Sequence, residues 1–269
     1  MGFRTLFRWL GRRQPPPILP EPLWQETVAS LPFLDRLDDD AKRRLRTLTE
    51  AFLAEKEFTS ARGLQLTDAM CVSIAAQGCL PILNLGLGYY RDWVGIIVYP
   101  DEFVIPRTQE DEYGIVHEYD EVASGEAWEG GPLLISWNDA QMAGEGYNVV
   151  IHEFAHKLDM LNGDVDGIPP LPAGMSAQAW EDILTAAYED FCREVDIADA
   201  NDEETVLDPY GAENPGEFFA VMSETFFETP ERLQEAYPAL YEQFTRFYRQ
   251  TPVTTPCPDS LTPSDPGSA

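Results

Sequence analysis

The spacing of apolar residues divides the chain into helical and extended parts. Residues 23–58 have a helical pattern with three aspartates ahead of its charged middle, where a helix N-terminus favours acids. Its apolar positions recur three and four residues apart, at Leu45, Leu48, Phe52 and Leu53. Between 94 and 137, short β-branched and aromatic runs alternate with Pro, Gly and acids, which predicts the strands of a small sheet. Helical spacing returns at 147–161, 176–196, 215–228 and 230–250.

Residues 69–90 carry no charged side chain, so they raise the question of a membrane span. Ser73, Gln77 and Pro81 interrupt the apolar character of this stretch. We therefore predict a buried helix that ends before Pro81, and no stable membrane insertion.

The two ends differ from the middle. Residues 1–21 combine basic residues with a proline cluster and contain no unbroken apolar stretch, so they predict an arm rather than a secretory signal. Residues 251–269 are rich in Pro, Ser and Thr and predict a disordered tail. The remaining segment, 22–250, is expected to form one α+β domain.

Charge and cysteine content narrow the class of protein. With 18 Lys and Arg against 47 Asp and Glu, the formal net charge is −29. Such a surface repels phosphate backbones, so we expect no direct nucleic-acid binding. The four cysteines form no C-x-x-C pair, which argues against a zinc ribbon or a disulfide scaffold. These features predict a cytoplasmic protein.

The sequence VVIHEFAHKLDMLNG contains the pattern H-E-x-x-H at His152, Glu153 and His156. Residues i and i+4 of a helix are neighbours, so both imidazoles can bind one metal ion, zinc by preference. Glu153 can then act as the base for a metal-bound water. Because the chain has only three histidines, chance would produce this pattern about 0.003 times. Two hydrogen-bonded histidines in a buried helix are the structural alternative.

A catalytic zinc site needs a third protein ligand and an open position for water. No histidine lies downstream of His156, so the third ligand is a carboxylate or His117. Glu217, near the start of the helix predicted after Pro215, is the favoured candidate, and Glu224 is the competing one. Asp159 either accepts the outer N–H of a ligand imidazole or is an ordinary surface charge.

The stretches HEFAHKLDMLNGD and DPYGAENPGEFFAVMSETFF, together with GYYRDWVGIIVYPDEFVI, GIVHEYDEV and GPLLISWNDA, resemble the Mlc titration factor A family of bacterial zinc peptidases. The resemblance covers about residues 22–250. It implies a zincin-like fold with a catalytic core similar to anthrax lethal factor, and an aminopeptidase-like activity on peptide or aminoacyl substrates. It also implies binding to Mlc, a transcriptional repressor of sugar uptake.

The same resemblance implies roles for single residues. Glu217, in the P-x-E-F-F stretch, is then the third zinc ligand of one Zn²⁺ per chain. Tyr210, seven residues earlier, stabilises the transition state, although a tyrosine in a D-P-Y-G turn is often a packing residue. His117 lies at the metal site, as an additional ligand that occludes it.

The sequence thus predicts a zincin-like metallopeptidase with a small mixed sheet, an active-site helix carrying H-E-x-x-H and a mainly helical C-terminal half. The strand PLLISW could be the edge strand that pairs with extended substrate, if it lies at an edge of the sheet. Two alternatives stay open. The protein could mainly sequester a repressor, with a latent or structural zinc site, or it could hydrolyse amides other than peptides.

Overall fold

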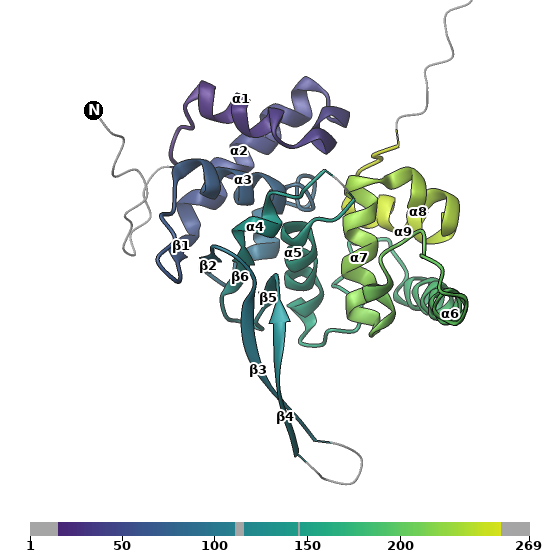
Figure 1. Ribbon diagram of the computed structural model, residues 1–269. Helices are drawn as coiled ribbons and strands as arrows, with labels where there is room; N and C mark the ends of the chain where they lie inside the picture. The colour runs from purple at the N-terminus through teal and green to yellow at the C-terminus, as the bar shows by residue number, and fades with distance from the viewer. Residues whose placement is uncertain (1–15, 111–115, 145, 254–269) are drawn as a thin grey trace, which may run out of the picture.

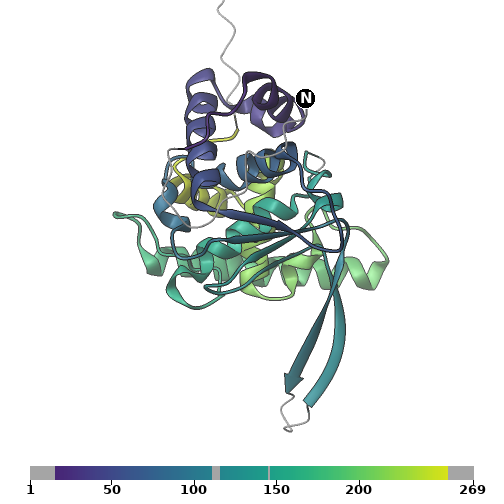
Figure 2. The ribbon, with the colours of Figure 1, turned by 90° about the vertical axis from the view of Figure 1, so that its left-hand side faces the viewer.

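The computed structural model describes residues 16–110, 116–144 and 146–253, with side chains at 109, 110, 117 and 118 also outside the description. It is a mixed α+β structure (Figures 1 and 2). The expectations for the basic end of the N-terminal arm and for the tail beyond residue 253 lie outside the described residues.

The N-terminal helices stack on one side of the sheet (Figure 1). They are α1 (Glu21–Ala29), the 3-10 turn η1 (Pro32–Arg36), α2 (Asp39–Glu55) and α3 (Asp68–Cys79). The Asp38 carboxylate accepts from the Ala41 N–H, so the aspartate run does cap α2. The prediction of helix up to residue 58 is wrong at its end, because Glu57–Ser60 forms strand β1 and pairs with a neighbouring strand.

In the described part of the chain, the main sheet has four strands in the order β1-β2-β6-β5. Strands β1, β2 (Gly95–Tyr99) and β6 (Leu133–Ser136) are parallel, and β5 (Gly125–Ala127) runs antiparallel to β6. PLLISW supplies β6, which lies between β2 and β5. It is therefore not an edge strand, and the edge on its side of the sheet is the short strand β5.

Strands β3 (Phe103–Glu110) and β4 (Val116–Ala123) form a separate antiparallel ribbon. The ribbon projects from the body of the protein (Figures 1 and 2). Val104 and Val122 are paired across it and are both about half exposed or more, at 48% and 62%. The predicted small sheet is thus two separate units.

The C-terminal half is helical, as predicted, and packs beside the sheet domain (Figure 1). Its long helices are α5 (Val149–Asp159), α6 (Ala177–Asn201) and α7 (Pro215–Glu228). The helix expected at 230–250 is two helices, α8 (Pro230–Ala236) and α9 (Pro238–Tyr248), because Pro238 cannot donate the next helical hydrogen bond. The short elements are α4 (Trp137–Ala140), η2 (Leu87–Tyr90), η3 (Met160–Asn162) and η4 (Pro209–Ala212).

Helix α5 lies at the centre of the molecule. Gly78 of α3 lies so close to the ring of Phe154 that a Cβ atom there would overlap it, so this glycine permits the close packing of α3 on α5. The Phe154 ring also packs against Phe52, Tyr90 and Trp93, with centroids 5.2–5.7 Å apart. All eleven residues of α5 are buried, so its polar side chains are buried as well. Within the described residues, no helix is long and apolar enough to cross a membrane.

Candidate metal centre

Helix α5 begins at a side-chain cap, and the 3-10 turn that follows it ends at a glycine. Asn148 accepts from the Ile151 N–H at 2.8 Å, and Gly163 closes the following turn with a φ of 100°. His152 and His156 are 7% and 6% exposed. The helix therefore presents both imidazoles from a rigid, buried element.

Helix α7 lies against α5 and presents three glutamates to it. Asn214 caps the helix by accepting from the Glu217 N–H at 3.0 Å, and Pro215 occupies its first turn. Glu217, Glu224 and Glu228 follow at spacings of seven and four residues, which keeps them near one face of the helix. Glu217 lies in the first turn, where the helix dipole favours a negative charge.

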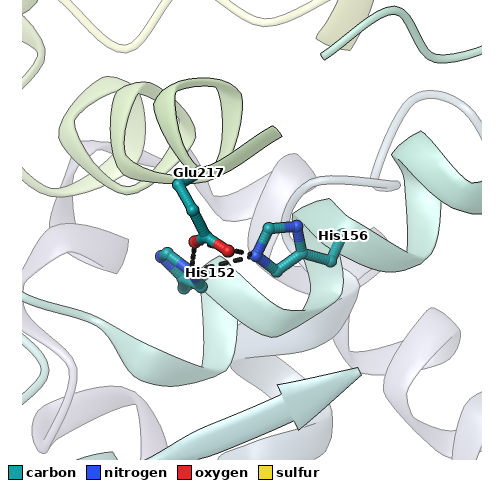
Figure 3. A group of neighbouring side chains, drawn as sticks. All are labelled: His152, His156 and Glu217. Atoms are coloured by element: carbon teal, nitrogen blue, oxygen red, sulfur yellow. Dashed lines mark hydrogen bonds and ion pairs between the residues drawn. The ribbon is translucent and has the colours of Figure 1, made fainter. Parts of the chain in front are cut away.

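Three possible ligand atoms converge between the two helices (Figure 3). The Nε2 atom of His152 lies 2.9 Å from Glu217 Oε2 and 3.1 Å from His156 Nε2. The third side of this triangle, from His156 Nε2 to Glu217 Oε2, is 3.2 Å. A tetrahedral ion with bonds of about 2.0–2.2 Å needs ligand atoms roughly 3.3–3.5 Å apart, so the triangle is within a few tenths of an ångström of that geometry.

The hydrogen-bond partners of His152 support a cation between the three ligand atoms. The opposite nitrogen of His152, Nδ1, lies 2.7 Å from Glu224 Oε1, and Glu224 Oε2 accepts from the Asn148 N–H at 2.7 Å. With an ionised Glu224 accepting on both oxygens, Nδ1 of His152 carries the proton. In a neutral ring Nε2 then has a lone pair that faces the Glu217 carboxylate. A positive ion or an added proton must separate these acceptors, so the residues present fit a metal ion.

The two candidate carboxylates have different places. Glu217 lies with the Nε2 atoms, whereas Glu224 contacts the far side of the His152 ring, where it fixes the tautomer. Burial alone would raise the pKa of Glu217, but the hydrogen bonds from His152 and His156 hold that pKa well below its usual range. Glu217 is therefore ionised, as a metal ligand must be.

Glu153 lies between the imidazoles in sequence and is 5% exposed. Burial raises the pKa of its carboxyl to about 7. Its Oε2 atom has no hydrogen-bond partner among the described residues. Gly125 of β5 lies against this carboxylate, and a Cβ atom at that position would overlap it. The edge strand thus approaches Glu153 closely only because residue 125 is a glycine.

Tyr210, in η4, is near the predicted site. Its ring centroid is 5.9 Å from that of His152, and the residue is 42% exposed. Burial of part of the side chain, together with the Glu217 charge, raises the pKa of its phenol, so it stays a proton donor at neutral pH.

Two other predicted residues have different outcomes. His117 lies in β4 opposite Gln109, and its side chain lies outside the described residues. Asp159 is fully buried, so it is not a surface charge. One of its oxygens accepts from the Gly167 N–H at 2.8 Å, and the other has no partner among the described residues. Asp159 thus orders the loop after α5 and makes no hydrogen bond to His156 within the described part of the chain.

A cleft of about 380 Å³ opens over these groups. Its walls include edge strand β5 and the base of the β3–β4 ribbon, where Arg107 pairs with Glu121 and Glu126. The sequence pattern does not predict this wall, because β5 has only three residues, Gly125–Ala127, and glycine, glutamate and alanine are all depleted in strands. The glycine within S-G-E-A was the available signal.

Lys157, directly after His156, was also missed. It is 3% exposed, and its ammonium group donates to the carbonyl oxygens of Trp128 and Gly131 at 2.5 and 3.0 Å. These carbonyls belong to the turn that joins β5 to β6. Lys157 therefore attaches the turn after edge strand β5 to helix α5.

Comparisons with known proteins agree with this geometry. Residues 7–249 match the family described as glucose-regulated metallo-peptidase M90. The chain is 38% identical over 251 residues to a Serratia proteamaculans protein named Mlc titration factor A, covering 92% of this chain and 94% of that protein. Proteins of the same name from Edwardsiella ictaluri and Escherichia fergusonii are 39% and 36% identical, with 92% of this chain and 95% and 93% of those proteins covered. The predicted resemblance is confirmed, and the chain belongs to the glucose-regulated metallo-peptidase M90 family.

Proposed function

We propose that this protein is a zinc-dependent peptidase with aminopeptidase-like activity, in a zincin-like domain spanning residues 22–250. The observation that carries the proposal is the convergence of His152 Nε2, His156 Nε2 and Glu217 Oε2 beside the buried Glu153 carboxylate. Two imidazoles and one carboxylate are a donor set typical of catalytic zinc, which keeps a fourth position for water. Bound there, zinc would supply Lewis acidity toward a carbonyl oxygen and lower the pKa of a water molecule.

The protein's own groups supply the remaining chemistry. Glu153, whose pKa is raised to about 7, accepts a proton from the attacking water and returns it to the leaving amine. Tyr210, which lines the cleft beside His152, donates a hydrogen bond to the oxyanion. Glu224 holds the His152 ring in the tautomer that directs Nε2 toward the metal.

Substrate orientation follows from the edge strand. Among the described residues, strand β5 pairs with β6 on one side only, so its other side offers backbone groups along the cleft. An extended peptide can add to this side by main-chain hydrogen bonds, which hold its carbonyl near Glu153. The preference for particular substrate side chains then depends on the residues that line the cleft.

The test combines metal analysis with hydrolysis of alanyl-p-nitroanilide, for wild type and Glu153→Gln. We expect about one zinc per chain in both proteins, with activity reduced about 100-fold or more in the variant. Zinc in both without activity in either would support a latent or structural site. A zinc-free protein would contradict the proposal. Activity on simple carboxamides but not on peptides would favour the broader class of amide hydrolases.

A second function is supported by the names of the relatives. Those proteins are called Mlc titration factors, so we propose that this chain also binds an Mlc-like repressor. Its net charge of −29 suits a basic, DNA-facing partner surface. Binding of purified repressor to wild type and Glu153→Gln separates the two roles. Equal binding by both proteins is expected, and a sequestering role predicts that the variant also keeps the effect on repressed genes.

A further inference from the structure

The wall of the cleft opposite the metal-binding helices contains a compact charged group. Arg107 of β3 donates from Nε to Glu121 Oε2 at 2.6 Å. Its two terminal nitrogens donate to the two oxygens of Glu126, at 2.9 and 2.7 Å. Glu121 belongs to β4 and Glu126 to β5, so this cluster joins the ribbon to the edge strand.

The cluster lies beside the reacting groups. Glu126 is the neighbour of Gly125, whose backbone lies against the Glu153 carboxylate. Glu121, Glu126 and Arg107 line the same cleft as His152 and Glu153. Their side chains are 35%, 17% and 32% exposed, so they are accessible from the cleft yet partly withdrawn from solvent.

Hydrogen-bonding capacity indicates what this wall can bind. Each of the three nitrogens of Arg107 donates to a carboxylate, which uses three of the five N–H groups of the guanidinium. The two carboxylates together have about eight lone pairs, of which these bonds use three. Among the described residues, the cluster therefore has more unused acceptors than unused donors, and with one positive and two negative groups its net charge is negative. Its complement is a donor-rich cation.

The buried end of the cleft gives independent support. Glu153 is 5% exposed, and its Oε2 atom has no partner among the described residues. The cleft as a whole is lined by six carboxylates and one guanidinium, an excess that one divalent ion does not neutralise. The acidity of the chain does not make every cavity acidic, because a separate cavity of about 260 Å³ is lined by Arg36, Arg44 and Arg249 with a single acid, Asp38.

We propose that Glu121 and Glu126, fixed by Arg107, form an ammonium-binding subsite that orients the substrate at the metal centre. The proposal rests on the proposed peptidase function. The ammonium group belongs either to the free N-terminus of a peptide or to a lysine side chain. In the first case the carbonyl to be attacked is the first in the chain, and the cleft cuts one residue at a time.

Equilibrium binding to the zinc-loaded full chain tests this directly. The probes are L-alaninamide, N-acetyl-L-alaninamide and N-acetyl-L-lysinamide, with Glu153→Gln as the background so that no probe is hydrolysed. Glu121→Gln keeps an acceptor for Arg107 but removes the charge. Asp120→Asn is the matched control, because Asp120 is exposed on the same strand, next to Glu121, and is not among the cleft-lining residues.

We expect Glu121→Gln to weaken binding of the ammonium-bearing probe about tenfold or more, since it removes a charge-assisted hydrogen bond. Binding of N-acetyl-L-alaninamide and zinc content should not change. Loss for L-alaninamide identifies the N-terminus as the source, and loss for N-acetyl-L-lysinamide identifies the side chain. Equal weakening of all probes, no weakening of any, or the same effect from Asp120→Asn would overturn the subsite.

Steady-state kinetics tests the ammonium-binding subsite separately from the proposed peptidase function. With the otherwise wild-type protein, Glu121→Gln should raise KM for alanyl-p-nitroanilide or for N-acetyl-lysyl-p-nitroanilide, whichever the binding assay selects. KM for N-acetyl-alanyl-p-nitroanilide should stay the same. A protein that binds the ammonium probe through Glu121 but hydrolyses none of these substrates keeps the subsite and contradicts the peptidase function.

Discussion

Helix α7 separates two interiors of opposite character. Toward α5 it presents Glu217, Glu224 and Glu228, which contact two histidines, an asparagine and backbone N–H groups. Toward α6 and α9 it contributes to an aromatic cluster of stacked and edge-to-face rings. The rings of that cluster are Trp180, Phe219, Phe226, Phe244, Phe247 and Tyr248.

The contrast shows how one helix serves stability and chemistry together. Aromatic burial is favourable without specific partners, so that side can stabilise the fold. Buried carboxylates are costly unless each has a partner, and burial raises the pKa of Glu153, Asp159 and Glu228 to about 7. The acidic side is therefore a functional interior that the aromatic side supports.

The largest expected effect tests the aromatic side. Phe244 is fully buried and stacks on Trp180 with ring centroids 5.6 Å apart. Phe244→Ala should lower the free energy of unfolding by about 3–5 kcal/mol, measured by urea denaturation. Zinc bound per folded chain should stay unchanged. Loss of zinc at temperatures where the variant is still folded would contradict the proposal that the aromatic side of α7 stabilises the fold without affecting metal binding.

The acidic side should carry the pH dependence of the metal-free protein. The pKa of Glu228 is near 7 in the folded state against 4.5 for the free group, so the folded protein keeps a proton that the unfolded chain has released. The contribution of Glu228 to the free energy of unfolding is then greatest below pH 4.5. It falls by about 3 kcal/mol as the pH rises through 7. Asp159 and Glu153 act in the same direction.

Urea denaturation in the presence of a chelator, at pH 5 and pH 8, measures this slope. Glu228→Gln should make it shallower, while Glu231→Gln, whose side chain is 59% exposed, should not. A metal-free wild type that becomes more stable between these pH values would contradict the interpretation.

A smaller effect concerns the contact behind His152. Glu224→Gln weakens the acceptor for the Nδ1 proton while keeping the shape of the side chain. We expect zinc affinity to fall about 10–100-fold, measured by competition with a chelating dye, with little change in the unfolding of the metal-free protein. Unchanged affinity would show that the His152 ring is fixed by packing alone.

The smallest effect compares two buried lysines that both lie near Trp93. Lys157 and Lys56 each donate to two backbone carbonyls, with ammonium nitrogens 5.1 and 3.9 Å from the Trp93 ring. Only Lys157 binds the turn that precedes β6 and follows edge strand β5. Lys157→Met should raise KM for a tetrapeptide a few-fold, about 1 kcal/mol or less.

Lys56→Met is the matched control. Both changes should destabilise the fold, because each leaves two carbonyl oxygens without their donor. Equal KM values for the two variants would show that the edge strand keeps its place without Lys157.

Much of this could be predicted from local sequence. The ends of helices α5 and α7 were expected within two residues, and those of α6 within five, because their caps and apolar spacing are local. Strand β1 was missed because its partner β2 is distant in the chain. Edge strand β5 was missed because it has only three residues, Gly, Glu and Ala, and all three residue types are depleted in strands. The sequence also did not show that PLLISW lies inside the sheet, because its pairing with the distant strand β2 is decided by the fold.

The sequence by itself determined that His152, Glu153 and His156 share one turn of a helix, because the i,i+4 spacing fixes their separation regardless of the fold. Only the tertiary structure decided which glutamate joins them. Glu217 and Glu224 lie on nearly the same face of α7, so the choice depends on how far α7 is shifted along α5. That shift is set by packing between helices more than fifty residues apart in the chain, including the aromatic cluster on the other side of α7.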